Sequence, residues 1–463
     1  MSTEQQPDLK RPWGRSARPV PRRIVRPVQQ FLHAEAASGI ILLFATVVAL
    51  AWANLDPSGY YDFWHAKISL TIGGWTETST LAHAVNDGLM AIFFFVIGLE
   101  VKRELTVGEL ADRRAALLPL AAAVGGMLVP AALFLLVTAG SPADVRDGWG
   151  IPMATDIAFA LGVLALLGSR VPAALKVLVL GIAVIDDIGA IIVIAIFYSS
   201  GVAWLWLLAA GGSLVALWVL QRLNVRSLLP YVAIGTFTWY ATYSSGIHAT
   251  IAGVALGLLT PSRAFQRGDE VSDAARRIAA ETRDDPANPD KDSQPWQLLA
   301  WLSRESVSPL TRVENAIHPW SAGVVLPIFA LANVGVVIDP EIVDRALHSM
   351  LALGIAAGLV IGKPLGILLG SWLAVRLGAA ALPTGVRWSH VVGAGALAGI
   401  GFTMSLFVTT LAYHDAAHIK VATMAVLGAS VVAGVLGAAI LLRAGTQDAS
   451  SVESAGPGET RGA

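Results

Sequence analysis

Residues 148–189 read GWGIPMATDIAFALGVLALLGSRVPAALKVLVLGIAVIDDIG. This stretch is almost entirely apolar, yet it contains three aspartates, Asp156, Asp186 and Asp187. A carboxylate at the centre of a lipid bilayer costs about 2.5 to 3.5 kcal/mol on insertion scales. A buried polar network that only fixes helix packing is normally built from Ser, Thr, Asn or Gln instead. The three aspartates therefore favour a path for ions or protons through a membrane.

The composition of the whole chain supports a membrane protein. Of 463 residues, 55% are hydrophobic and only 14% are charged, and the mean hydropathy is +0.64. The 45 glycines fit membrane helices, in which Gly is frequent. A net charge of −1 without a basic stripe indicates no nucleic-acid binding, and the lack of cysteine excludes disulfides and thiolate metal sites. We therefore predict a polytopic protein of the lipid bilayer that needs no cofactor.

Twelve apolar runs follow one another along the chain, and each predicts a membrane-spanning segment. A helix needs about 20 apolar residues to cross a bilayer, so the seventh and eighth runs are short. They form a pair about Tyr243-Ser244-Ser245, and a re-entrant hairpin there would leave the later topology unchanged. The sequence thus predicts an all-α fold with about twelve transmembrane helices. The runs are 37–54, 84–101, 116–139, 150–168, 172–198, 202–220, 228–242, 246–260, 316–337, 350–375, 390–412 and 420–442.

Polar segments flank and interrupt the transmembrane transporter domain, which extends over residues 31–442. Residues 1–30 form a basic N-terminal arm, and 443–463 form a tail with the composition of a disordered segment. Residues 262–308 form a polar loop in which 271–283 predicts a surface helix. Lysine and arginine gather on alternate loops, as the positive-inside rule requires. This alternation predicts that both termini and the long polar loop lie in the cytoplasm.

Residues 68–79 of the first outer loop contain two strand-like runs on either side of Gly73-Gly74. A two-residue glycine turn between short β-prone runs is typical of a small β-hairpin. A plain coil fits the same residues, so both interpretations remain open.

The fourth and eleventh spans contain residues that interrupt helices. In the fourth, Pro152 precedes Thr155-Asp156, a pair that would cap a new half-helix. In the eleventh, a series of glycines up to Gly401 precedes Thr403. Spans 3–5 and 10–12 run in opposite directions and so form inverted repeats. Broken helices at corresponding places of inverted repeats indicate a transport site near the middle of the membrane.

Charged side chains lie where the two broken helices need them. The N-termini of half-helices bring partial positive charge to the midplane, and the C-termini bring partial negative charge. Asp156 would balance the N-termini, and the intramembrane Lys363 would balance the C-termini.

The adjacent aspartates of the fifth span cannot share one partner, because neighbouring residues on a helix point about 100° apart. One of Asp186 and Asp187 would pair with Lys363. The other would line an ion cavity with Asp156 and Thr155, whose oxygens suit a hard cation such as Na+ or Li+. Carboxylates in such surroundings can also exchange protons near neutral pH. Competition between cation and proton for the same carboxylates would then produce exchange.

Over residues 31–442 the chain resembles the NhaA family of Na+/H+ antiporters. The resemblance rests on motifs from the second span to the eleventh, so it covers the whole transmembrane domain. The motifs are NDGLMAIFFFVIGLEVKREL at 86–105, ATDIAFALG at 154–162, IDDIGAI at 185–191, SGIHATIAG at 245–253, HPW at 318–320, LPIFALANVG at 326–335, GKPLG at 362–366 and GIGFTMSLF at 399–407.

By motif match, the resemblance implies that Asp187 is the main cation ligand and that Asp186 is the partner of Lys363. It implies that Thr155 and Asp156 are the polar centre of the broken fourth helix. Asp187 and Asp156 would together hold the Na+ or Li+. The family also implies electrogenic, pH-activated exchange of cytoplasmic Na+ for external protons, in a bacterial inner membrane and in the service of sodium and pH homeostasis.

The resemblance further implies a homodimer that forms partly through residues 68–79, and a pH response at the cytoplasmic mouth. Residues 311–315, Thr-Arg-Val-Glu-Asn, depart from the family pattern, which is more basic there and has a second histidine beside the glutamate. The departure leaves the pH setpoint open, while the central site matches. The candidate pH-response residues are Glu100, Glu104, Glu314, His318 and His248.

Three other classes of membrane protein fit the sequence less well. An intramembrane aspartyl protease also has aspartates on neighbouring helices, but Asp186 lacks the expected Gly-x-Gly before it. A cation channel needs a ring of carbonyls or carboxylates, and nothing in the sequence suggests fourfold assembly. A sodium-coupled symporter of a small organic solute is the closest alternative, but beyond Lys363 the spans offer no extra group for the solute. We therefore expect a transporter and not an enzyme.

Overall fold

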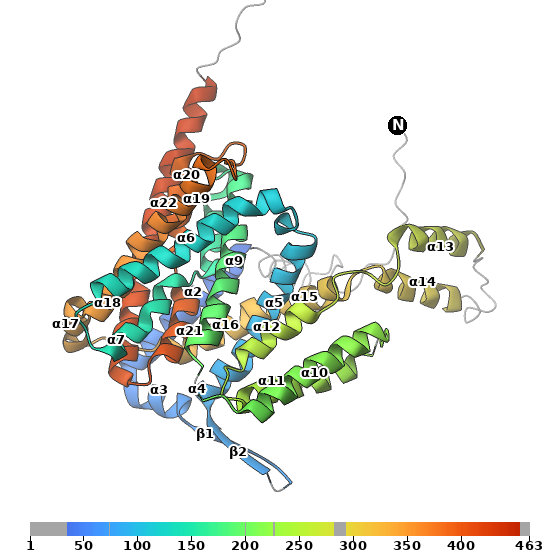
Figure 1. Cartoon of the computed structure of the whole chain (residues 1–463), viewed down its shortest axis with the longest axis horizontal. Helices are drawn as coiled ribbons and strands as arrows, with labels where there is room; N and C mark the ends of the chain where they lie inside the picture. Colours follow the sequence, from blue (N-terminus) through green and yellow to red (C-terminus); the bar gives the residue numbers. More distant parts are fainter. Residues whose placement is uncertain (1–34, 74, 200, 226, 282–292, 454–463) are drawn as a thin grey trace, which may run out of the picture.

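The structure is a computed structural model, and it describes residues 35–73, 75–199, 201–225, 227–281 and 293–453 (Figure 1). The predicted basic arm at 1–30 lies outside these residues. Within them, helices form almost all of the regular structure, and one two-stranded sheet is the exception. The predicted all-α membrane fold is confirmed.

The helices follow one another with short connections. In the first half of the chain they are α2 (Glu35–Leu55), α3 (Pro57–Trp64), α4 (Leu81–Ala84), α5 (Met90–Thr106), α6 (Arg113–Val137), α7 (Ala143–Arg146), α8 (Ile157–Leu167), α9 (Ala173–Phe197), α10 (Trp204–Arg222), α11 (Leu228–Ser244) and α12 (Thr250–Leu259). In the second half they are α13 (Gly268–Glu281), α14 (Ser293–Glu305), α15 (Pro309–Trp320), α16 (Leu326–Asn333), α17 (Pro340–His348), α18 (Met350–Ala357), α19 (Lys363–Arg376), α20 (Trp388–Ala398), α21 (Phe402–Ala412) and α22 (Ala416–Glu453).

Nine helical segments of the described chain are long and apolar enough to cross a membrane, and the bent pair α20 and α21 makes a tenth. The other two of the twelve predicted spans are α11 and α12, which have only 17 and 10 residues. Several long spans contain a loosened π-helical turn, as at Gly358–Gly362 before α19. Pro364 explains this turn, because a proline nitrogen cannot donate the hydrogen bond that would close the regular helix.

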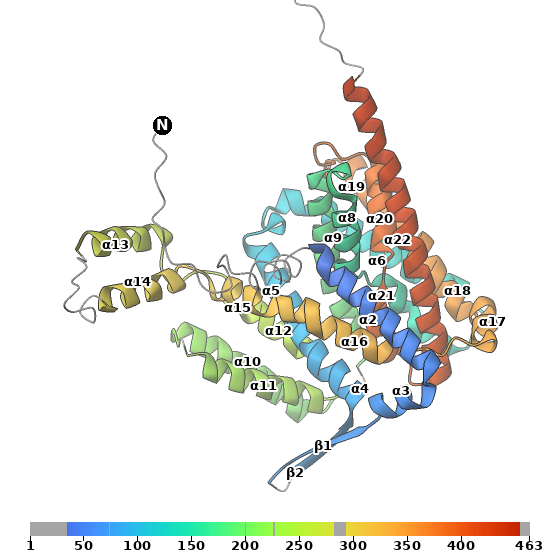
Figure 2. The ribbon, with the colours of Figure 1, turned by 180° about the vertical axis from the view of Figure 1, so that it is seen from behind.

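Strands β1 (Lys67–Ile72) and β2 (Trp75–Thr80) form an antiparallel hairpin. Their register places Lys67 opposite Thr80 and Ile72 opposite Trp75. Gly73 has a φ of +62°, which glycine adopts without strain and which the tight turn requires. The hairpin projects away from the helices in both views (Figures 1 and 2). The hairpin prediction for residues 68–79 is confirmed, and the coil interpretation is wrong.

The long polar loop contains more helix than the sequence predicts. Helix α13 confirms the surface helix expected within 271–283, and a second helix, α14, lies beside it. At the other end of the domain, α22 continues as far as Glu453. The tail predicted to be disordered from residue 443 therefore begins as helix. The end of an apolar run marks where a chain can leave the hydrocarbon, and a helix can continue beyond that point.

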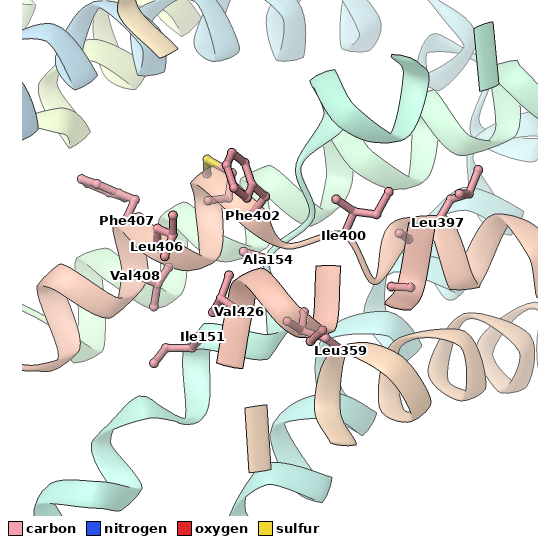
Figure 3. Close-up of a cluster of buried hydrophobic side chains, with 14 of the residues drawn as sticks. Ile151, Ala154, Leu359, Leu397, Ile400, Phe402, Leu406, Phe407, Val408 and Val426 are labelled. Atoms are coloured by element: carbon pink, nitrogen blue, oxygen red, sulfur yellow. The ribbon is translucent and has the colours of Figure 1, made fainter. Parts of the chain in front are cut away.

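Both predicted interruptions are present. In the fourth span a 3₁₀ segment, Asp147–Met153, leads into three non-helical residues before α8 begins at Ile157. In the eleventh span α20 ends at Ala398, and α21 begins at Phe402 after a bend of 47°. Figure 3 shows the crossing, with Ala154 and Ile400 on the two links and apolar side chains such as Leu359 and Val426 packed around them.

The two broken spans run past each other in opposite directions. The hydroxyl of Tyr413 donates to the carbonyl of Val145, and that of Ser405 donates to the carbonyl of Ile151, both at 2.7 Å. Further in, the backbone N–H of Asp156 donates to the carbonyl of Ile400 at 2.7 Å. Residue numbers thus rise along one span as they fall along the other, which agrees with the inverted arrangement expected from the sequence.

Helices α6 and α19 approach each other closely through glycine. A Cβ placed on Gly366 would lie 2.2 Å from the carbonyl oxygen of Gly125, and a Cβ on Gly125 would lie equally close to the carbonyl of Gly366. Small residues at membrane helix interfaces allow such backbone contact. The close packing brings Lys363, at the start of α19, into the centre of the domain, where it is fully buried.

Candidate ion-binding site

Asp156 joins the two half-helices that begin at the crossing. Its Oδ1 accepts a hydrogen bond from the N–H of Phe159 at 3.1 Å, which caps the N-terminus of α8. Its Oδ2 accepts from both the N–H of Thr403, at 3.1 Å, and the hydroxyl of the same residue, in the first turn of α21. One carboxylate therefore faces the partial positive charge of two helix N-termini, as the sequence predicts for this residue.

The C-terminal ends of the half-helices receive two different donors. The ammonium of Lys363 donates to the carbonyl of Met153, the last residue of the 3₁₀ segment. The hydroxyl of Thr155 donates to the carbonyl of Ala398 at 3.0 Å, at the end of α20. The sequence assigns both ends to Lys363, but the described contacts give that lysine only the first. The neutral hydroxyl of Thr155 binds the end of α20 because Thr155 lies on the non-helical link of the fourth span, which passes that end.

Lys363 also forms an ion pair with the fifth span. Its Nζ lies 2.6 Å from Oδ2 of Asp186, on α9, and the two side chains are 0% and 1% exposed. A buried ion pair of this kind needs close geometry and further hydrogen bonds to offset the loss of hydration. The carbonyl of Met153 supplies one such bond. Asp186 is thus the aspartate of the adjacent pair that meets the lysine.

Asp187 has a different environment from its neighbour. It is 2% exposed, and its Oδ1, like that of Asp186, has no hydrogen-bond partner among the described residues, but unlike Asp186 it forms no ion pair there with Lys363. The charges of Asp186, Asp156 and Lys363 all act on it, and so does the charge of Glu100 from the direction of α5. A buried carboxylate oxygen without a donor is costly. Such an oxygen suits a group that is occupied in turn by a cation and by a proton.

The acidic groups do not form a preassembled metal cage. Within the described part of the chain, no three His, Asp or Glu side chains are grouped as ligands of one metal ion. Asp187 and Asp156, the predicted cation ligands, therefore approach the centre from different helices without sharing a closed site. A site from which an ion must leave again can bind that ion only with moderate affinity.

Four of the five predicted pH-response residues gather where α5 meets α15. His318 Nε2 lies 3.6 Å from Glu100 Oε1, and Arg103 bridges Glu314 and Glu104, the latter at 3.4 Å. Glu104 and Glu314 are buried. Arg103, the cation that joins the two glutamates, is not among the predicted site residues.

The fifth candidate, His248, lies apart from this cluster. Its Nε2 is 2.8 Å from the carbonyl of Tyr198, just beyond the C-terminus of α9. The other four candidates, Glu100, Glu104, Glu314 and His318, form what we call the mouth cluster. The first half of α9 passes Leu110, close to this cluster. His248 therefore lies at the opposite end of α9 from the other four candidates.

Three contact residues at the site were not predicted as such. Thr403 holds Asp156, and Tyr198 and Tyr413 hold the N-terminal part of the fourth span. The hydroxyl of Tyr198 donates to the carbonyl of Asp147 at 2.8 Å and accepts from the N–H of Gly150 at 3.1 Å. Thr403 could have been found from the sequence, because its hydroxyl follows the glycine break of GIGFTMSLF directly. No sequence pattern marks the two tyrosines.

Comparison with known proteins agrees with this arrangement. The family model described as Na+/H+ antiporter 1 matches residues 29–441. The chain is 48% identical over 415 residues to Na(+)/H(+) antiporter NhaA 2 of Myxococcus xanthus, covering 89% of this chain and 88% of that one. It is 47% identical to the protein of the same name from Sorangium cellulosum, covering 92% and 91% of the two chains. It is 45% identical to Na(+)/H(+) antiporter NhaA of Oleidesulfovibrio alaskensis, covering 93% and 96%.

These relatives carry the names of antiporters, so they give no support to the symporter alternative. They are also transporters, as the sequence predicts, and not enzymes. The family match, the identities and the coverage of both chains all point the same way. The chain belongs to the Na+/H+ antiporter 1 family.

Proposed function

We propose that this chain exchanges cytoplasmic Na+ or Li+ for external protons at a site centred on Asp187. The observation that carries the proposal is the contrast between two adjacent carboxylates. Both keep a buried Oδ1 without a donor, but of the two only Asp186 pairs with a cation among the described residues, through its Oδ2 and Lys363 at 2.6 Å. The exchange needs no cofactor, because the gradients of the two ions supply the free energy.

The mechanism follows from competition for the same oxygens. When Asp187 is deprotonated, its free oxygen binds the cation, and Asp156 adds negative charge from the crossing of the broken helices. When a proton occupies the carboxylate, the cation loses its charge partner and leaves. Each cycle then moves protons one way and a cation the other, and a cycle with more protons than cations is electrogenic.

The positions of the remaining groups complete the proposal. The cluster of Glu100, Glu104, Glu314 and His318 lies at the cytoplasmic mouth and adjusts activity with pH. The spans lie in the inner membrane of a bacterium and both termini lie in its cytoplasm, a topology that the alternation of basic loops supports. The hairpin of residues 68–79 lies on the outer side, where it joins two copies of the chain into a homodimer.

Transport by the purified protein in liposomes tests the proposal. We expect an imposed Na+ or Li+ gradient to drive proton movement in the opposite direction, and Asp187→Asn to abolish it because the charge for which the ions compete is gone. Asp144→Asn, an exposed aspartate on α7, is the matched control and should transport normally. Proton movement that needs no Na+ or Li+ would contradict exchange, and near-normal transport by Asp187→Asn would contradict the assigned site.

A further inference from the structure

Helices α13 and α14, within the polar loop, have very different compositions. Residues 293–303 of α14 read SQPWQLLAWLS and contain no charged side chain. Helix α13 reads GDEVSDAARRIAAE and contains six charged side chains over a similar length. A tryptophan-containing helix whose residues before Arg304 and Glu305 are all uncharged is unexpected in a loop that is otherwise rich in charge.

Three apolar side chains of α14 remain partly exposed. Trp296, Leu298 and Trp301 are 46%, 51% and 43% exposed. On α13, Val271 is buried, and the charged residues from Asp269 to Arg277 are exposed, so this part of α13 turns its apolar side inward and its charges to water. Leu298 and Trp301, three residues apart, share one face of α14, whereas Trp296 lies on another face. The exposed apolar face of α14 is therefore the one that carries Leu298 and Trp301.

The same pair is fixed close to the point where the chain enters the membrane. Only residues 306–308 separate α14 from α15, which begins a candidate membrane span. The four steps along the chain from Glu305 to Pro309 extend at most about 14 Å, so the end of α14 lies within about that distance of α15.

Backbone hydrogen bonds shorten the attachment further. The N–H groups of Phe265 and Gln266 both donate to the carbonyl of Glu305 at 3.1 Å, and the N–H of Leu310 donates to the carbonyl of Pro261 at 3.1 Å. The loop thus leaves and re-enters the helical body as a paired neck, with α13 and α14 extending to one side of the spans (Figures 1 and 2).

We propose that α14 lies in the cytoplasmic interface of the bilayer, with Leu298 and Trp301 in contact with lipid and α13 on its water side. Tryptophan is enriched at the level of the lipid headgroups, and interfacial helices sink their apolar face about 5–10 Å into the boundary between headgroups and acyl chains. The lipid is the occupant because the neck keeps α14 near a membrane span, and because residues 293–303 contain no charge. The exposed Arg304 at the end of α14 can bury its aliphatic stem and keep its charge among the headgroups.

The absence of cysteine from the chain permits a direct test. Leu298→Cys and, separately, Trp301→Cys would each place a single thiol on the exposed side of α14, and Ser272→Cys on the exposed side of α13 is the matched control. Each variant is labelled with an environment-sensitive fluorophore and placed in phosphatidylcholine nanodiscs, so that both membrane faces are open to solvent. Quenching is measured with aqueous iodide and with lipids that carry a nitroxide at a shallow or a deep position of the acyl chain.

We expect the label at 298 or 301 to be quenched several-fold more by the shallow nitroxide lipid than the label at 272, and several-fold less by iodide. The label at 272 should behave as a fully aqueous group. If iodide quenches positions 298 and 301 as strongly as 272, α14 is in water and the proposal is wrong. If neither quencher reaches them, α14 is covered by protein, and the lipid assignment is equally wrong.

Discussion

Lys363 and Asp186 form an ion pair that water does not reach, since both side chains are almost completely buried. Removing one partner of a buried ion pair costs about 3–5 kcal/mol, because the other charge stays buried and uncompensated. Lys363→Met should therefore lower the thermal unfolding temperature of the purified protein strongly. Asp186→Asn combined with Lys363→Met removes both charges and should regain most of that loss.

The comparison of single and double variants isolates the pair. Ser371→Ala is a suitable reference, because Ser371 is buried on the same helix, α19, and belongs neither to the pair nor to the crossing. The unfolding temperatures of all these variants, measured in the same detergent, show whether the ion pair itself stabilises the domain. A double variant as unstable as Lys363→Met would mean that the lysine stabilises the domain through Met153 and its packing, and not through Asp186.

At the scale of residues, the sequence reveals charges better than it reveals their neutral partners. A lysine or an aspartate within an apolar run is conspicuous, so Asp156, Asp186 and Lys363 could be identified without a structure. A threonine within such a run is ordinary helix packing. Thr403 becomes recognisable as the partner of Asp156 only when the fourth and eleventh spans are seen to cross.

At the scale of helices and strands, two tyrosine hydroxyls hold the N-terminal part of the fourth span in place. Tyr198 holds Asp147, and Tyr413 holds Val145. We expect Tyr198→Phe and Tyr413→Phe together to raise the Na+ concentration needed for half-maximal exchange several-fold, because the freed segment leads directly to Met153. Tyr61→Phe, which changes an exposed tyrosine of α3, should leave the kinetics unchanged.

The tyrosine variants should not alter the pH profile. Burial raises the pKa of both Tyr198 and Tyr413 above the ordinary value of about 10. A raised folded-state pKa means that their contribution to stability is fully present below about pH 10 and is lost only as the pH rises further. Between pH 6 and 9, on either side of neutrality, both hydroxyls remain donors. A shift of the profile in this range would show that the tyrosines act on the titrating groups themselves.

The sequence predicts these elements unevenly, for physical reasons. Glycine and proline mark the breaks of the fourth and eleventh spans, because they lack a side chain or an N–H that helices use. The ends of the spans are less visible. Helix α22 continues to Glu453 because hydropathy reports the membrane boundary and not the helix boundary. Helix α14 was missed because its short apolar run lies inside a segment whose average composition is polar.

At the scale of the whole molecule, Glu100 on α5 connects the mouth cluster to the central site. Glu100 lies 3.6 Å from His318, and its charge also acts on Asp187. Glu100→Gln removes a negative charge that helps to hold protons on neighbouring carboxylates. These carboxylates should then release protons at a lower pH, so the rising limb of the activity profile should move to lower pH by on the order of one unit.

His248→Gln is the matched control for the mouth, because His248 lies at the opposite end of α9 beside Tyr198. Exchange is measured in liposomes from pH 6 to 9 for both variants. This range covers the neutral pH values at which carboxylate and imidazole sites commonly adjust activity. We expect the control profile to stay in place. A uniform loss of maximal activity in Glu100→Gln with an unmoved profile would mean that Glu100 supports the fold of the mouth and does not sense pH.

The β-hairpin gives the whole molecule an assembly that can be tested. Its two six-residue strands pair only with each other in the described chain. An isolated two-stranded hairpin is marginally stable in water, and both of its outer edges can pair with another strand. Two copies related by a twofold axis could join their edges into one four-stranded sheet, which closes the assembly as a dimer.

Deleting residues 68–79 should therefore convert the protein into monomers. The central aspartates and Lys363 all lie within one chain, so the monomers should still exchange Na+ for protons, and the loss should be seen as a lower unfolding temperature. Crosslinking in native membranes measures the assembly, and transport in liposomes measures the exchange. A deletion variant that crosslinks as a full dimer would assign the contact to helices, because the described chain would then have lost its open strand edges without losing its partner.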